Sequence, residues 1–143
     1  MKVKDIMTKN VVYVSPTTTI TEAAQLMQKH NIGSLPVVDQ NKVVGMITDR
    51  DIVVRNVAHG TDPHNTKVQD VMTSRVETAN PDMDVDDVAA KMSSVQVRRM
   101  PVVENNQLVG MVALGDLATN PLSDTEASEA LTEISKPSKP AEM

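Results

Sequence analysis

The sequence lacks cysteine, tryptophan and phenylalanine, and Tyr13 is its only aromatic residue. The absence of cysteine excludes disulfides, thiolate metal sites and cysteine nucleophiles. Ten methionines are present, while the large aromatic side chains that usually fill a core are almost missing. Because methionine packs adaptably, we expect a core made of Val, Ile, Leu and Met.

Long hydrophobic runs and an excess of positive charge are also missing. No apolar stretch approaches the roughly 20 residues that a membrane-spanning helix needs. The chain opens on Lys2-Val3-Lys4-Asp5, without the apolar region of a secretory signal. The formal net charge is −5 and the pI is near 5.1, opposite to the balance of a nucleic-acid-binding surface. We therefore expect a cytoplasmic protein that binds no membrane, and we do not expect it to bind nucleic acid.

The chain is internally duplicated. Asp5-Ile6-Met7-Thr8 recurs as Asp70-Val71-Met72-Thr73, and Gly45-Met46 recurs as Gly110-Met111, in each case 65 positions later. Superposing residues 2–52 on 67–117 without a gap gives 17 identities in 51 positions, where ordinary composition would give on the order of three or four. One copy alone would bury little surface, so we expect the two copies to pack against each other.

Each copy predicts the same order of elements, β-α-β-β-α. A β-rich piece at 10–14 precedes Thr19 and Glu22, which have the spacing of a helix capping box. Two strands then form a hairpin that turns at residues 40–41 in the first copy and at 105–106 in the second, and a further helix opens at Thr48. One buried stripe is expected on the first helix of each copy: Ile20, Ala23, Ala24 and Met27, and then Val85, Val88, Ala89 and Met92.

The expected boundaries are 1–60 for the first repeat, 61–66 for a linker and 67–120 for the second repeat. In the remaining segment, 121–143, residues 124–135 have the apolar spacing of a short amphipathic helix. The stretch Lys136-Pro137-Ser138-Lys139-Pro140 predicts a disordered tail. The sequence leaves open whether this helix caps the repeats or reaches a partner.

Together these motifs resemble the CBS domain. The opening V-x-D-[IV]-M-T, the [LM]-P-V-V strand and the G-M-[IV]-x(3)-D-[IL] turn occur in order in both copies, so the resemblance covers residues 2–118. It implies an α/β (α+β) fold of two repeats packed with pseudo-two-fold symmetry, known as a Bateman module. Because no effector domain is attached to the repeats in this sequence, the chain is similar to the stand-alone bacterial CBS-pair proteins.

The resemblance implies a regulatory sensor of adenine nucleotides. Family members bind AMP, ADP, ATP or S-adenosylmethionine in clefts between the repeats, and a hydroxyl residue and an aspartate at a strand-to-helix turn contact the ligand. The matching residues are Thr48 and Asp51, whose carboxylate can accept from both hydroxyls of a ribose. Their spacing is also that of a capping box, so capping alone is an open alternative. In the second copy the hydroxyl position is Ala113, while Asp116 remains.

A basic pair, Arg98-Arg99, stands where the first copy has Gly33-Ser34. The family holds ligand phosphate at these positions, and the arginine fork suits phosphate oxygens; a solvated loop pair is the alternative. By family geometry the repeats form two unequal sites, of which the first should bind phosphate better. The main site comprises Thr48, Asp51, Val76, Glu77, Arg98 and Arg99, and the weaker site comprises Val11, Val12, Thr18, Gly33 and Asp116.

Other candidate chemistry finds little support. The three histidines have no metal-ligand spacing, and no serine or threonine has an identifiable His and acid around it, so we predict neither a metal site, nor catalytic residues, nor an enzyme. No cofactor is obligatory; a regulatory nucleotide could carry Mg²⁺ near Asp49 and Asp51. We expect a homodimer that signals to an unidentified effector protein. The alternative function is a ligand-free scaffold that dimerises and recruits a protein partner.

Overall fold

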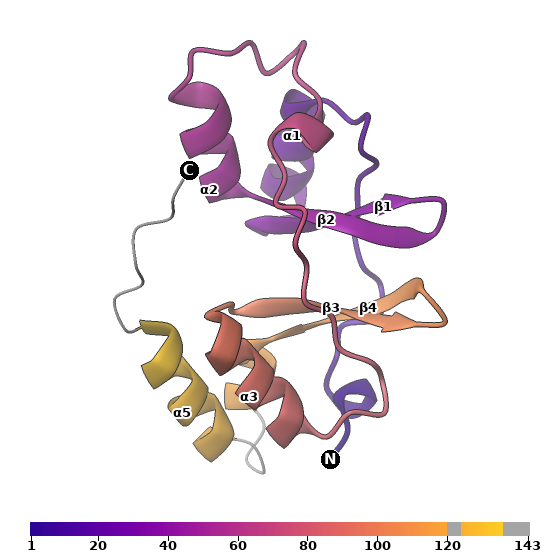
Figure 1. Cartoon of the computed structure of the whole chain (residues 1–143), viewed down its shortest axis with the longest axis vertical. Helices are drawn as coiled ribbons and strands as arrows, with labels where there is room; N and C mark the ends of the chain where they lie inside the picture. Colours follow the sequence, from indigo (N-terminus) through magenta and orange to yellow (C-terminus); the bar gives the residue numbers. More distant parts are fainter. Residues whose placement is uncertain (120–123, 136–143) are drawn as a thin grey trace. The chain divides into compact units, whose positions relative to one another are not determined.

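The structure is a computed structural model that describes residues 1–119 and 124–135 (Figure 1). The chain forms two compact units. Unit 1 comprises Met1–Lys9, Glu77–Glu104 and Val109–Met143, and unit 2 comprises Asn10–Val76 and Asn105–Leu108. These units cut across the two sequence repeats, because the opening segment of each repeat belongs to the unit that holds the body of the other.

Unit 2 contains the first helix and hairpin of the chain. Its elements are α1 (Ile20–His30), β1 (Ser34–Asp39), β2 (Lys42–Thr48), α2 (Asp49–Ile52), the π-helical turn η2 (Val53–Val57) and the 3-10 turn η3 (Val68–Asp70). The Thr19 hydroxyl caps α1 by accepting from the Glu22 amide at 3.2 Å, which is the hydroxyl half of the predicted capping box. β1 and β2 pair antiparallel, with Leu35 opposite Ile47, and both of these side chains are fully buried in the core of the unit.

Unit 1 repeats this arrangement and adds a helix. Its elements are η1 (Val3–Asp5), α3 (Val85–Val95), β3 (Arg99–Glu104), β4 (Gln107–Ala113), α4 (Leu114–Ala118) and α5 (Asp124–Ser135). In each unit the helices lie on one side of the two-stranded sheet (Figure 1). Both hairpins of the chain have tight turns: Gln40, Asn41, Asn105 and Asn106 all have positive φ. The mixed helix-and-strand class and the duplication are thus confirmed.

The first β-rich piece of each copy is less regular than the sequence predicts. Residues 10–14 form no strand; Val14 makes a single parallel bridge to Val37, and Ala79 makes the equivalent bridge to Val102. Val14 donates its amide to the Pro36 carbonyl at 3.0 Å and accepts from the Val38 amide at 2.8 Å. At this edge Val14 therefore contributes both of its backbone groups, and residues 10–13 have no regular secondary structure.

Glycine is required where an opening segment crosses a hairpin strand. In unit 2, Met46 of β2 exchanges two backbone hydrogen bonds with Thr73, at 2.9 and 2.8 Å. A Cβ on the neighbouring Gly45 would lie 2.9 Å from the Thr73 carbonyl oxygen and 2.5 Å from the Met72 sulfur. Gly110 has the same relation to Met7 and Thr8 in unit 1. The duplicated Gly-Met pair of the sequence thus marks a close backbone approach.

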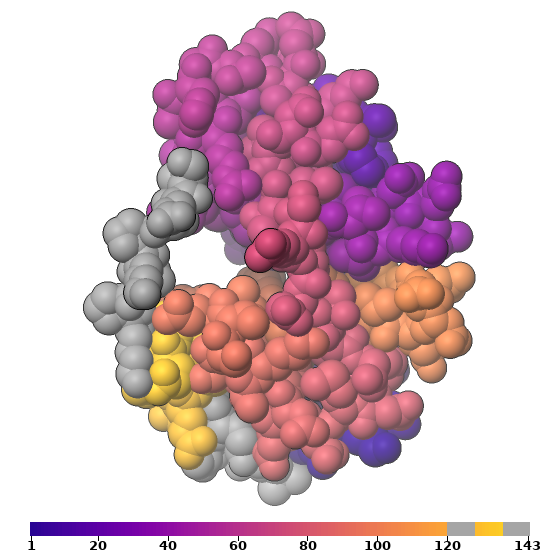
Figure 2. Space-filling model, in the orientation of Figure 1, coloured from indigo at the N-terminus to yellow at the C-terminus, as the bar shows by residue number. Residues whose placement is uncertain are grey.

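The helix expected at residues 124–135 is present as α5 and packs on α3 and α4. Figure 2 shows the yellow surface of α5 beside the salmon surface of α3. Ala130 is buried in the unit 1 core and Ile134 packs against it. This packing explains one wrong prediction: Ala24 was expected in the buried stripe of α1 but is exposed, whereas its counterpart Ala89 is buried. Both alanines lie beside the stripe, and only unit 1 has an additional helix to cover them. The predicted disordered tail lies outside the described residues.

Candidate functional site

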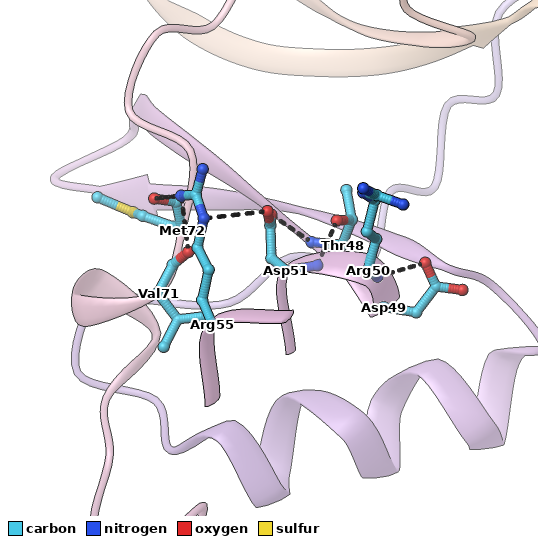
Figure 3. Close-up of polar contacts among 7 residues, drawn as sticks. All are labelled: Thr48, Asp49, Arg50, Asp51, Arg55, Val71 and Met72. Atoms are coloured by element: carbon cyan, nitrogen blue, oxygen red, sulfur yellow. Dashed lines mark hydrogen bonds and ion pairs between the residues drawn. The ribbon is translucent and has the colours of Figure 1, made fainter. Parts of the chain in front are cut away.

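The strand-to-helix turn of unit 2 forms a complete capping box (Figure 3). β2 ends at Thr48, whose hydroxyl accepts from the Asp51 amide at 3.0 Å. In return, Oδ2 of Asp51 accepts from the Thr48 amide at 3.1 Å. The capping role that the sequence left open is therefore real. The cap leaves the Asp51 carboxylate able to accept further hydrogen bonds, because its two oxygens offer about four acceptor sites and the Thr48 amide occupies one.

Arg55 completes this turn, and sequence reasoning missed it. Its Nε lies 3.9 Å from Oδ1 of Asp51, one helical turn earlier. Its Nη1 donates to the carbonyl oxygens of Val71 and Met72, each at 3.3 Å. Figure 3 shows the guanidinium between the Asp51 carboxylate and these carbonyls. The i, i+4 spacing of an aspartate and an arginine could have indicated the ion pair, but the carbonyl partners depend on tertiary structure.

The equivalent turn of unit 1 keeps half of the capping box. Ala113 has no hydroxyl, but its amide donates to Oδ2 of Asp116 at 2.7 Å. This bond explains the retained aspartate without a ligand, so Asp116 on its own is weak evidence for a second binding site. The residue at the Arg55 position is Asn120.

The basic pair and its counterpart lie at the start of the first hairpin strand: Arg99 and Ser34 are the first residues of β3 and β1, and Arg98 and Gly33 directly precede them. The Arg98 carbonyl accepts from the Leu114 amide at 2.8 Å, and the Gly33 carbonyl accepts from the Asp49 amide at 2.9 Å. Both Arg98 and Arg99 are exposed. Within the described residues, neither guanidinium has a carboxylate or hydrogen-bond partner. These two cations are thus available to an anion.

The corresponding position of unit 2 has a carboxylate nearby and no arginine. A Cβ on Gly33 would lie 2.8 Å from Oδ2 of Asp49, so a carboxylate stands where unit 1 has Leu114 beside Arg98. The Ser34 hydroxyl is buried without a partner among the described residues. This position of unit 2 is therefore ill suited to hold a phosphate.

The remaining predicted residues are divided between the units. Val11, Val12, Thr18, Gly33 and Val76 lie in unit 2 with Thr48 and Asp51, and Glu77 lies in unit 1 with Arg98, Arg99 and Asp116. Glu77 pairs with Lys91 of α3 at 3.4 Å, and the Thr18 hydroxyl accepts from the Ser15 amide at 3.1 Å. Each predicted set draws on both units, and the pairing of the two halves stays a prediction.

The described part of the chain also has no cluster of potential metal ligands and no membrane-spanning helix. In residues 1–119 and 124–135, no three His, Cys, Asp or Glu side chains are grouped closely enough to hold a metal ion. His64 instead shares a hydrogen bond of 3.1 Å with the Thr21 hydroxyl. Within the same residues no helix has the length and apolar character to cross a membrane.

Comparison with known proteins identifies the family of both repeats. The family model of the CBS domain matches residues 3–56 and 68–123. The chain belongs to the CBS-domain family. CBS-pair proteins are generally regulatory and not catalytic. The CBS domain-containing protein YhcV of Bacillus subtilis is 50% identical over 133 residues, which cover 93% of this chain and 94% of that protein.

Two solved CBS structures bear on the ligand and on assembly. The CBS domain pair of protein MJ0100, solved in complex with 5′-methylthioadenosine and S-adenosyl-L-methionine, is 38% identical with a TM-score of 0.74, covering 82% of this chain and 93% of that one. The hexameric CBS-CP12 protein from bloom-forming cyanobacteria is 29% identical with a TM-score of 0.73, covering 84% and 70% of the two chains. CBS pairs similar to this chain thus include one that binds adenosine compounds and one that forms a hexamer.

Proposed function

We propose that this CBS pair is a regulatory module that binds an adenine nucleotide and catalyses no reaction. The observation that carries the proposal is the exposed Arg98-Arg99 pair, which has no partner within the described residues. A similar CBS pair binds adenosine compounds, and two free guanidinium groups add a preference for a phosphate. We therefore propose AMP, ADP or ATP ahead of S-adenosylmethionine, whose sulfonium is positively charged.

The Thr48–Asp51 turn is proposed to hold the ribose. The Asp51 side chain is 12% exposed, and its carboxylate retains acceptor capacity beyond the cap. The amides at the start of α2 favour negative charge nearby. A ligand that binds one arrangement of the repeats more tightly than another would shift the balance between them. The effector protein, an accompanying Mg²⁺ and the cytoplasmic location stay predictions.

Nucleotide binding is tested by thermal shift and calorimetry. Millimolar AMP, ADP or ATP is expected to raise the melting temperature, because a ligand that binds the folded state stabilises it. Asp51→Asn and Arg98→Gln should each weaken the affinity about tenfold, the scale of a lost charged hydrogen bond. Asp116→Asn should weaken it less.

Arg50→Gln provides the matched control, because Arg50 is an exposed arginine on the same helix as Asp51. Its affinity should equal that of the wild type. If AMP, ADP, ATP, S-adenosylmethionine and NAD all leave the melting temperature unchanged, the sensor proposal is wrong and the scaffold alternative gains. If a nucleotide binds but Asp51→Asn and Arg98→Gln have wild-type affinity, the residue assignment is wrong.

A homodimer is proposed through the helices of unit 2. Val53 and Val57, one turn apart on η2, are 58% and 62% exposed. Among the described residues no helix covers them, whereas α5 covers α3 and α4 in unit 1. The charges of α1, α2 and η2 balance, with Glu22, Asp49 and Asp51 against Lys29, Arg50 and Arg55. This face therefore does not repel a second copy of itself, whereas the acid-rich helices of unit 1 would. Two-fold dimers are the commonest assemblies.

Because the chain has no cysteine, one introduced thiol reports on this face cleanly. Val57→Cys is expected to form a covalent dimer under mild oxidation, since a two-fold interface places equivalent residues near each other. Leu131→Cys, at a 45% exposed residue of α5, should not. The yield is read on non-reducing gels, and the mass of the unmodified protein by sedimentation. A monomeric wild type, or equal cross-linking of both variants, would contradict the proposed interface.

A further inference from the structure

Arg55 connects two parts of unit 2 that are distant in the sequence. One side of its guanidinium faces Oδ1 of Asp51 at 3.9 Å, and Nη1 donates to the Val71 and Met72 carbonyls. These carbonyls directly follow η3, which is closed by the Met72 amide donating to Val68 at 2.9 Å. Arg55 therefore ties the proposed ribose acceptor to the segment that opens the second repeat.

The tied segment is held on two sides. Thr73 pairs with Met46 of β2 through two backbone hydrogen bonds, while Arg55 holds the preceding carbonyls. The segment continues to Val76, which the sequence predicts to contact the ligand. Arg55 thus contacts both the Asp51 carboxylate and the start of residues 71–76, although its own side chain is 40% exposed.

The duplication indicates that these features belong together. The first repeat has Thr48, Asp51 and Arg55, whereas the second has Ala113, Asp116 and Asn120 at the same offsets. Only the first repeat therefore has the capping hydroxyl and the arginine of the ion pair, whereas both repeats have the aspartate. Asparagine has no charge, and its side chain is shorter than that of arginine.

We infer that Arg55 is a positioning residue that links occupation of Asp51 to the hold on residues 71–76. This inference rests on the proposed nucleotide function. A ribose hydroxyl that donates to Oδ1 of Asp51 uses the same oxygen that faces Arg55. Binding at this carboxylate and the grip on the Val71 and Met72 carbonyls are therefore coupled, and the coupling acts in both directions.

The experiment compares Arg55→Gln with Arg50→Gln in the full chain. Calorimetry with AMP and 2′-deoxy-AMP gives the ratio of their affinities. This ratio reports how well the Asp51 carboxylate is oriented to accept from the two ribose hydroxyls. We expect a ratio of about tenfold in the wild type and in Arg50→Gln, and about twofold in Arg55→Gln. A purely structural arginine would lower both affinities together and leave the ratio unchanged. Arg55→Lys, which can keep the ion pair, should recover much of the ratio.

Hydrogen exchange of residues 71–76 without nucleotide provides the second measurement. Loss of the carbonyl bonds in Arg55→Gln is expected to speed exchange in this segment several-fold relative to Arg50→Gln, and added AMP should alter it in the wild type. An unchanged affinity ratio, or an exchange rate equal in the two variants, overturns the inference. If the wild type binds neither AMP nor 2′-deoxy-AMP, AMP is not the ligand and the coupling inference fails with it, while the exchange rates alone still show whether Arg55 holds the segment.

Discussion

Leu35→Ala is expected to lower the free energy of unfolding by about 2–5 kcal/mol, the usual cost of a cavity left by a large core side chain. Leu35 is fully buried in the core of unit 2, opposite Ile47 across the hairpin. Because whole domains are stable by only about 5–15 kcal/mol, this is among the largest effects that we expect from one substitution. Urea denaturation followed by circular dichroism measures it.

Met100→Ala is the matched variant in unit 1, because Met100 occupies the Leu35 position of the second repeat and is also fully buried. Lys42→Ala is the exposed control on the same hairpin as Leu35 and should change stability by less than about 0.5 kcal/mol. If the units unfold separately, Leu35→Ala and Met100→Ala should each displace a different transition. A loss below about 1 kcal/mol in both would contradict the core assignment.

Gly45→Ala is expected to cost about 2–4 kcal/mol, through overpacking and through weakened hydrogen bonds at the strand crossing. The added Cβ would meet the Thr73 carbonyl oxygen at 2.9 Å, and a backbone atom cannot move aside as a side-chain end can. Gly110→Ala should have a similar effect, because a Cβ there would lie 2.9 Å from the Thr8 carbonyl oxygen. Thermal and urea unfolding provide the measurement.

Gly115→Ala separates this contact effect from the general effect of replacing glycine. Gly115 lies in α4, and no atom of the described residues is within 4 Å of its would-be Cβ, so alanine there should stabilise the helix by about 0.5–1 kcal/mol. Opposite signs for Gly45→Ala and Gly115→Ala are the expected result. A neutral Gly45→Ala would show that the opening segment does not approach β2 as closely as described.

Local patterns in the sequence predict the local structure well. The Thr19 cap, the apolar stripes and the positive-φ hairpin turns each depend on residues a few positions apart, and all are present. The exposed Ala24 shows where this reasoning ends: the stripe is set by α1 itself, but burial beside it depends on whether another helix packs there. Whether a further helix such as α5 covers a residue is decided by tertiary packing, which the spacing of apolar residues in the sequence does not indicate.

The candidate site divides in the same way. The spacing of Thr48 and Asp51 predicts the cap, and the structure shows both of its hydrogen bonds. Arg55 was not predicted to act, because its carbonyl partners at Val71 and Met72 are about 16 residues away and backbone carbonyls carry no residue signature. Likewise, the repeat pattern gave no sign that each opening segment joins the unit of the other repeat.

The exchange of opening segments has a consequence for the order in which the chain can fold during synthesis. Translation proceeds from the N-terminus, and most of unit 2 is one continuous stretch, Asn10–Val76. That stretch can collapse before the second hairpin has been made. Met1–Lys9 must wait, because their partners begin at Glu77, so these residues are made before unit 2 but pack after it. A gene cut at the repeat boundary would therefore yield two incomplete pieces, whereas a permuted gene that begins at residue 10 would let each unit form in turn.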